Sequence, residues 1–221
     1  MPTIEFKSGS RQDVGTVYCI GRNYAAHAKE LNNPLPSEPM VFLKPASSLV
    51  EEGAELELPP QSNDVHHEVE IVVVLNKGGR NLSLAEAKNT ISGYAVGIDV
   101  TARDLQQKAK AKGHPWSVAK GFATFGPLSR FVEVAEIEDR DAIDVELKIN
   151  DEIRQKGNSR DMVFTIPALI KHLSSIFDLQ PGDLVFTGTP EGVGPILNGD
   201  VLSASLGNNL VELKISAKKM K

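Results

Sequence analysis

The chain has 221 residues, of which 41% are hydrophobic and 24% are charged, values that exclude a disordered or fibrous protein. Its 24 Lys and Arg residues against 29 Asp and Glu residues give a net charge of −5, which argues against the basic face of a nucleic-acid-binding protein. The single cysteine, Cys19, excludes an internal disulfide and multi-cysteine metal centres. No apolar run is long enough to span a bilayer, and the amino-terminal residues do not resemble a secretory or transit signal. A cytoplasmic protein without membrane or nucleic-acid partners is therefore expected.

The predicted elements describe a strand-rich chain of the α+β class with a few short helices. We expect one domain at residues 16–221, preceded by a short extension at residues 1–15. β-Branched apolar runs predict strands at residues 17–20, 41–43, 68–75, 94–100, 145–149, 184–187, 201–206 and 210–215. Apolar residues at helical spacing predict helices at residues 23–31, 83–90, 101–112 and 165–177. The strands grouped late in the chain favour a mixed or antiparallel sheet.

The first predicted helix, residues 23–31, carries a histidine–glutamate pair. Asn23 is a suitable N-cap, and the three-residue spacing of His27 and Glu30 places both side chains on one helix face. A carboxylate beside an imidazole fixes its tautomer and raises its basicity, which suits a base that activates water. From spacing alone, a chance pair on a surface helix is the more common explanation. The following residues 32–39 predict an irregular loop able to move as a lid.

Two glutamates open the strand predicted at residues 68–75. Side chains alternate along a strand, so Glu68 and Glu70 share a face that continues into apolar residues. Carboxylates buried together raise each other's pKa or require a cation, and oxygen ligands favour magnesium, manganese or calcium over zinc. Asp99 ends the strand predicted at residues 94–100 on a face of small residues, which makes it a plausible third ligand. The alternative, a solvent-facing Glu-x-Glu on an edge strand, is at least as common for such spacing.

The helix predicted at residues 101–112 follows Asp99 directly, and residues 101–104 resemble a capping motif. Arg103, Gln106 and Lys110 fall on one helical stripe whose first members lie near the proposed metal. Arg103 or Gln106 could therefore hold a substrate carboxylate or carbonyl. A solvated stripe is the alternative.

Two lysines and one glycine-rich loop complete the candidate segments. Lys44 and Lys120 lie among apolar neighbours, and burial of a lysine needs an anionic partner. The loop at residues 187–195 has neither the glycine spacing nor the Lys-Ser/Thr of a nucleotide-binding loop. Its backbone N–H groups and threonine hydroxyls could approach a small anion.

In order along the chain, these segments resemble the fumarylacetoacetate hydrolase superfamily, in particular its short, single-domain branch of acylpyruvate hydrolases. Each motif alone is weak, and the ordered set over nearly the whole chain is specific. The motifs that carry the resemblance are Cys19-Ile20-Gly21-Arg22-Asn23-Tyr24 with His27 and Glu30, Phe42-Leu43-Lys44-Pro45, His66-His67-Glu68-Val69-Glu70, Asp99-Val100-Thr101-Ala102-Arg103-Asp104, Pro115-Trp116 with Lys120, and Thr187-Gly188-Thr189-Pro190-Glu191-Gly192-Val193-Gly194.

The resemblance implies a β-rich roll of mixed sheets with short flanking helices, assembled as a homodimer. It implies that Glu68, Glu70 and Asp99 bind Mg²⁺ or Mn²⁺, with water or substrate completing the shell, and that Ca²⁺ is a non-physiological occupant. His27 and Glu30 match the family's water-activating pair, on a helix that orders over substrate. Lys120 matches its active-site lysine. The residues that fall in substrate-contacting segments are Arg22, Asn23, Arg103, Gln106 and Thr189.

Three functions follow from these residues. The first is metal-dependent hydrolysis of the carbon–carbon bond of 2,4-dioxo acids, acylpyruvates such as fumarylpyruvate or acetylpyruvate, to pyruvate and a carboxylic acid. The second is oxaloacetate decarboxylation or keto–enol tautomerisation through the same metal-bound enolate. The third is a non-catalytic module in which the carboxylates hold a structural ion, and it leaves His27, Glu30 and Lys120 without a role.

Overall fold

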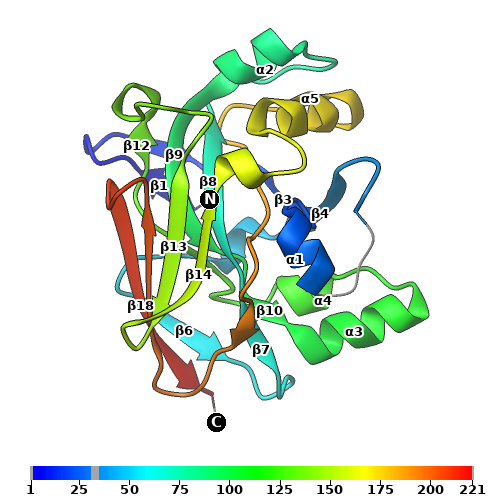
Figure 1. Cartoon of the computed structure of the whole chain (residues 1–221), viewed down its shortest axis with the longest axis vertical. Coiled ribbons are helices and arrows are strands. Elements are labelled where there is room, and N and C mark those ends of the chain that lie inside the picture. Colours follow the sequence, from blue (N-terminus) through cyan, green and yellow to red (C-terminus); the bar gives the residue numbers. More distant parts are fainter. Residues whose placement is uncertain (1, 31–34, 221) are drawn as a thin grey trace.

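The computed structural model describes residues 2–30 and 35–220 of the chain. Its centre is an eight-stranded mixed sheet in the order β4-β3-β15-β8-β9-β11-β5, with β12 also paired to β9 (Figure 1). The strands of this sheet are β3 (Val17–Gly21), β4 (Met40–Lys44), β5 (Leu49–Glu51), β8 (Val69–Leu75), β9 (Ile91–Ile98), β11 (Gly126–Leu128), β12 (Val132–Glu133) and β15 (Leu184–Phe186).

A five-stranded sheet in the order β14-β13-β17-β18-β6 packs against the central sheet. Its strands are β6 (Glu55–Leu58), β13 (Asp144–Ile149), β14 (Glu152–Asn158), β17 (Val201–Leu206) and β18 (Val211–Lys219). Alternate residues of β8 divide between two cores: Val69, Ile71, Val73 and Leu75 belong to the larger one, and Val72 and Val74 to the smaller one. Both faces of β8 are therefore buried.

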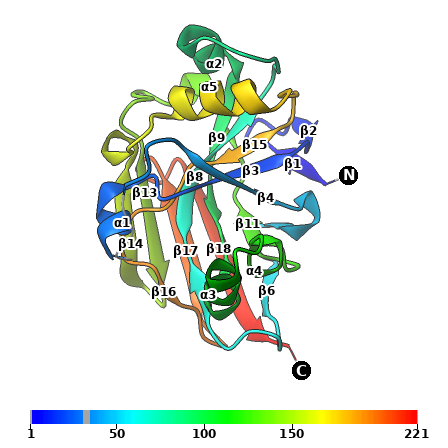
Figure 2. The same cartoon turned by 90° about the vertical axis from the view of Figure 1, so that its right-hand side faces the viewer.

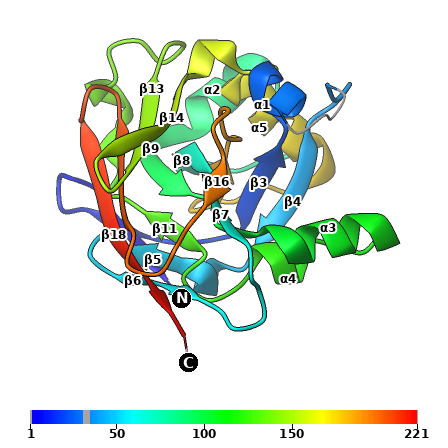
Figure 3. The same ribbon diagram turned by 60° about the horizontal axis from the view of Figure 1, so that its bottom comes forward.

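Short helices and ribbons surround the two sheets. Figure 2 shows α5 lying across the central sheet beside α2, whereas α3 and α4 lie together at the far end of the molecule. A small ribbon of three strands, β10-β7-β16, passes close to α3 (Figure 3). The remaining elements are β1 (Thr3–Glu5), β2 (Arg11–Asp13), α1 (Ala25–Glu30), η1 (Ala46–Ser48), β7 (Val65–His67), α2 (Leu84–Thr90), β10 (Thr101–Ala102), α3 (Arg103–Lys112), α4 (Ser117–Lys120), η2 (Val134–Glu136), η3 (Ser159–Asp161), α5 (Ile166–Ile176) and β16 (Gly194–Pro195).

The amino-terminal residues form a hairpin, β1 and β2, that joins the smaller core. Ile4, Phe6 and Val14 are buried there, and the ring of Phe6 lies 5.7 Å from that of Phe131 between centroids. The division between residues 1–15 and 16–221 stays a prediction. None of the helices in the described part of the chain is long and apolar enough to cross a membrane.

The predicted α+β roll is confirmed, with strands and helices near their predicted places. The cap predicted at residues 101–104 is wrong, because Thr101 and Ala102 pair with β7 as strand β10 and the Thr101 hydroxyl donates to the Asp99 carbonyl. Asn23 does not cap α1, which begins at Ala25. The predicted helix end, Leu31, and residues 32–34 of the predicted lid lie outside the described residues.

Candidate active site

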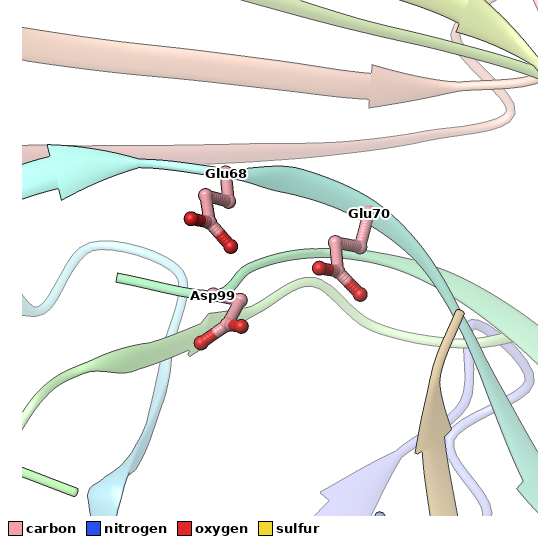
Figure 4. A group of neighbouring side chains, drawn as sticks. All are labelled: Glu68, Glu70 and Asp99. Atoms are coloured by element: carbon pink, nitrogen blue, oxygen red, sulfur yellow. The ribbon is translucent and has the colours of Figure 1, made fainter. Parts of the chain in front are cut away.

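Three carboxylates converge where β8 and β9 lie side by side. Glu68 stands between β7 and β8, Glu70 lies in β8 opposite Gly97 of β9, and Asp99 directly follows β9. All three are buried, and one carboxylate oxygen from each lies within 4.8 Å of the others (Figure 4). The solvent-facing edge strand considered above is excluded, because β8 lies inside the eight-stranded sheet.

Buried cations compensate two of these carboxylates. Lys120 Nζ lies 2.9 Å from Glu68 Oε2 and also pairs with Asp99 Oδ2, while Arg103 pairs with Glu68 Oε1. Glu70 has no cation partner among the described residues, and its Oε2 accepts the Gly188 N–H at 2.7 Å.

The pKa values of the two glutamates follow from this difference. Burial alone raises the pKa of Glu68, but Lys120 and Arg103 outweigh it and hold that pKa below its usual range. Burial, Asp99 and Glu68 together raise the pKa of Glu70 well above its usual value. Glu70 is therefore the carboxylate whose negative charge lacks compensation.

Asp99 leaves one oxygen without a hydrogen bond. Lys44 Nζ lies 2.8 Å from Asp99 Oδ1, yet it donates its three hydrogens to the carbonyls of Val100, Lys120 and Phe125. Among the described atoms Asp99 Oδ1 thus has no donor. The contact between Lys44 and Asp99 is therefore an ion pair without a hydrogen bond, because an ammonium has only three hydrogens.

These residues fit a hard divalent cation. The cluster offers only carboxylate oxygens, the ligands that Mg²⁺ and Mn²⁺ prefer. The uncompensated charge of Glu70, and Asp99 Oδ1, which lies near Lys44 but accepts no hydrogen bond in the described part of the chain, are the features that a bound cation would satisfy. Among the described residues, no fourth carboxylate belongs to this cluster.

A histidine–glutamate pair stands beside the carboxylates. His27 is buried and its Nδ1 lies 3.3 Å from Glu30 Oε2. Glu30 also accepts the N–H of Gly192 at 3.1 Å, which joins α1 to the loop at residues 187–195. Gly192 has a φ of +91°, and a Cβ there would stand 2.2 Å from the Arg154 carbonyl oxygen, so only glycine fits. The loop and the histidine are thus held together by one carboxylate.

One cavity of about 30 Å³ collects most of the predicted site residues. Larger cavities exist elsewhere, such as one of about 270 Å³ between the amino-terminal hairpin and β5, but the clustered ionisable groups line this small one. Its predicted lining residues are Arg22, His27, Glu68, Glu70, Arg103, Gln106, Lys120 and Thr189. Met40, Phe42, Lys110 and Trp116 also line it; Lys110 belongs to the Arg103 stripe, Phe42 and Trp116 lie in motifs of the family resemblance, and Met40 had no signal in the sequence.

The predicted substrate-binding residues differ in their surroundings. Arg103 Nη1 donates to Gln106 Oε1 at 2.7 Å, so the two act as one unit beside Glu68. Arg22 adopts a φ of +59°, a strained left-handed conformation of the kind that concentrates at functional sites. Asn23 is fully buried and outside the cavity lining, with its amide bonded to backbone groups of Phe164 and Thr187. Its substrate role stays a prediction.

Two further cations of the cavity have no ion-pair partner in the described part of the chain. No salt bridge joins Arg22 or Lys110 to a carboxylate of the described chain, whereas Arg103 and Lys120 are paired. Lys110 Nζ lies 5.7 Å from the centroid of the Trp116 ring. Burial, followed by Arg22 and Arg103, lowers the pKa of Lys110. The cavity can therefore attract an anion.

Comparison with known proteins defines the class. The model of the fumarylacetoacetate hydrolase C-terminal family matches residues 16–216. The chain belongs to this family, whose characterised members are enzymes that act on small molecules.

Three relatives of this chain have names that state an enzymatic activity. The chain is 47% identical over 201 residues to the mitochondrial oxaloacetate tautomerase FAHD1 of Arabidopsis thaliana, covering 91% of this chain and 88% of the relative. It is 46% identical over 191 residues to the mitochondrial oxaloacetate decarboxylase of Dictyostelium discoideum, covering 86% and 88%. The crystal structure of fumarylpyruvate hydrolase from Pseudomonas aeruginosa with Mn²⁺ and pyruvate matches with a TM-score of 0.94 and 34% identity, covering 99% of this chain and 96% of that one.

These relatives correct one expectation. The predicted cytoplasmic location is wrong, because both oxaloacetate enzymes named above are mitochondrial. Composition and a short amino-terminal pattern describe the physical class of a chain and do not determine its compartment.

Proposed function

We propose that this protein is a metal-dependent hydrolase that cleaves the carbon–carbon bond of 2,4-dioxo acids, acylpyruvates such as acetylpyruvate or fumarylpyruvate. The observation that carries the proposal is the contact of His27 with Glu30 beside three clustered carboxylates. A base held by a carboxylate at the edge of a metal site is the arrangement that activates water for hydrolysis.

Glu68, Glu70 and Asp99 would hold Mg²⁺ or Mn²⁺, and the Mn²⁺ in the Pseudomonas aeruginosa structure supports this assignment. When bound, such an ion is a Lewis acid that stabilises negative charge on the carboxylate and 2-oxo oxygens of a substrate. Arg103, Gln106 and Thr189 line the same cavity and would orient the substrate carboxylate.

The chain's own residues would carry the proton transfers. His27, oriented by Glu30, takes a proton from water, and the resulting hydroxide adds to the C4 carbonyl carbon. The C3–C4 bond then breaks, and its electron pair passes to the three-carbon fragment, which becomes the enolate of pyruvate. The Lys120 ammonium stabilises that negative charge. The proton held by His27 then passes to C3, which gives pyruvate and restores the base, and the other fragment leaves as a carboxylic acid.

A second candidate, chemistry on oxaloacetate, is favoured by the named activities of the 46–47% identical relatives. Tautomerisation needs only a proton moved between C3 and the 2-oxo oxygen, a role open to His27. Decarboxylation breaks the bond from C3 to the C4 carboxylate and gives the same enolate.

The test measures loss of acetylpyruvate and of oxaloacetate by ultraviolet absorbance, with Mg²⁺ and with a chelator, and quantifies pyruvate in the same samples. Mg²⁺-dependent loss of acetylpyruvate with one pyruvate per molecule lost supports the hydrolase. Loss of the oxaloacetate enol signal without pyruvate supports the tautomerase, and its loss with pyruvate supports the decarboxylase. A protein inert toward both compounds contradicts the proposal. The expected homodimer is checked by light scattering on the same preparation.

A further inference from the structure

One polar side chain is buried on a strand that otherwise faces solvent. Of the seven residues of β14, an edge strand of the five-stranded sheet, only Gln155 is buried, with 1% of its surface exposed. Its neighbour Ile153 is 57% exposed. A strand that buries a glutamine and exposes an isoleucine reverses the usual preference, so the glutamine needs an explanation.

Gln155 makes hydrogen bonds to two chain segments that carry site residues. Its Oε1 accepts the Val69 N–H at 3.0 Å and bonds His67 Nδ1 at 2.9 Å. Its Nε2 donates to Thr189 Oγ1 at 2.8 Å and to the Pro190 carbonyl at 2.9 Å. Two of these partners flank Glu68, and the other two belong to the loop that contacts Glu30.

Two backbone groups fix the orientation of this amide. The Val69 N–H can only donate a hydrogen bond and the Pro190 carbonyl can only accept one. If the Gln155 amide were rotated by 180°, its NH2 group would face the Val69 N–H and its oxygen would face the Pro190 carbonyl. His67 Nδ1 must therefore carry a hydrogen, and Thr189 Oγ1 must accept one from Gln155.

The hydroxyl hydrogen of Thr189 is then free to point elsewhere. Thr189 is 3% exposed and lines the cavity with Glu68 and Glu70. In the described part of the chain no acceptor for its hydroxyl is found, whereas Thr187, two positions earlier, donates its hydroxyl to the Ile71 carbonyl at 2.8 Å. A residue that lines the cavity thus carries a hydroxyl that accepts one hydrogen bond from Gln155 and whose own hydrogen is not used by the described residues.

We propose that Gln155 is a positioning residue that holds the Thr189 hydroxyl as a hydrogen-bond donor to an oxygen of the bound 2-oxo acid. The nature of that ligand rests on the proposed function, while the direction of the hydrogen bonds rests on the Gln155 contacts. Gln155 itself does not line the cavity, so its effect on binding passes through Thr189.

A double-mutant cycle on ligand binding tests this proposal. Calorimetric titration of pyruvate in the presence of Mg²⁺ gives the Kd for the wild type, Gln155→Met, Thr189→Val and the double variant. We expect Gln155→Met to raise the Kd about tenfold, the usual size of one lost hydrogen bond. In the Thr189→Val background the same change should raise it less than about twofold, because the hydroxyl is already absent. In the Thr189→Ser background the full effect should return.

A purely structural role predicts another pattern. If Gln155→Met raises the Kd equally with threonine and with valine at position 189, or does not raise it at all, the proposal is overturned. If the methionine variant does not fold, Gln155→Glu replaces it in the cycle. The effect of its added charge on the Kd is common to the proteins with threonine and with valine at position 189, so it cancels when the two changes in Kd are compared. Gln180→Glu, an exposed amide changed in the same way, is the matched control.

The two proposals fail separately. Wild-type protein that binds pyruvate but does not hydrolyse acetylpyruvate contradicts the proposed reaction and leaves the cycle valid. Wild-type protein that does not bind pyruvate with Mg²⁺ present overturns the role given to Gln155, because the Thr189 hydroxyl would then have no 2-oxo acid to bind.

Discussion

Replacing Glu70 by glutamine should raise the stability of the metal-free protein and weaken its binding of metal. Glu70 is 1% exposed, has no cation partner among the described residues, and accepts one backbone hydrogen bond from Gly188. Glutamine keeps the volume and an oxygen that can accept this bond, but it removes the buried negative charge. We therefore expect Glu70→Gln to raise the melting temperature of the metal-free protein, because the native wild type must either bury an unpaired charge or hold a proton on Glu70 above the ordinary pKa of glutamate, and both cost free energy.

The same change should abolish the stabilisation that a metal confers. A ligand that binds only the native state at 100 times its Kd contributes about 2.7 kcal/mol. For a chain of 150–250 residues each kcal/mol shifts the melting temperature by roughly 2–4 °C. Saturating Mg²⁺ or Mn²⁺ should thus raise the melting temperature of the wild type by about 5–11 °C. Glu70→Gln, which lacks one of three ligands, should show little of this shift.

Differential scanning calorimetry in chelator and at increasing Mg²⁺ measures both effects. Glu212→Gln is the matched control, because Glu212 is exposed on β18 and away from the carboxylates. A full metal-induced shift in Glu70→Gln would show that Glu70 is not a ligand. A lower melting temperature of this variant in chelator would contradict the view that its charge is uncompensated.

Three further outcomes follow from the site. His27→Gln should lower kcat for the proposed hydrolysis by about 10²–10⁴-fold and leave the Mg²⁺-induced melting shift intact; loss of that shift would contradict the role of a base. Lys110→Met should raise KM for acetylpyruvate about threefold at low salt, and Lys112→Met should not; equal effects in steady-state kinetics would refute the assignment of Lys110 to the cavity. In chelator, the stability of the wild type relative to that of Glu70→Gln should fall as pH rises above about 4.3, the ordinary pKa of glutamate. Burial, Asp99 and Glu68 raise the native pKa of Glu70, so the native state keeps a proton that the unfolded chain has released. Urea unfolding of both proteins across pH should show this slope in the difference between their stabilities.

The parts of the fold that were predicted are the strands and helices whose residue pattern is visible within a short stretch of the sequence. Residues 69–75 form a strand, as the β-branched residues 71–74 predict, and the structure adds that its two faces enter two different cores. The common face of Glu68 and Glu70 followed from the same alternation, and the structure brings Asp99 beside them. By contrast, β14 has the sequence EIRQKGN, with almost no apolar signal, and it was not predicted.

The contacts that were not predicted join residues far apart in the chain. Glu30 meets the N–H of Gly192, and Lys44 meets three carbonyls at residues 100, 120 and 125. No periodicity within a short window contains such pairs. The failed cap at Thr101 has the same origin, because pairing with β7 outweighs the local preference of threonine for a helix start.

The amino-terminal hairpin is part of the folded core, although it lies before the residues that the family model matches. The family model begins at residue 16, yet Ile4, Phe6 and Val14 lie buried in the smaller core with Phe131. The segment that the family model matches is therefore shorter than the segment that shields this core from water, whereas the match to the Pseudomonas aeruginosa structure covers 99% of this chain. A chimaera that exchanges only residues 16–216 between relatives would pack the hairpin of one protein against the core of another. Grafting this site into another member of the family should carry the hairpin along with it.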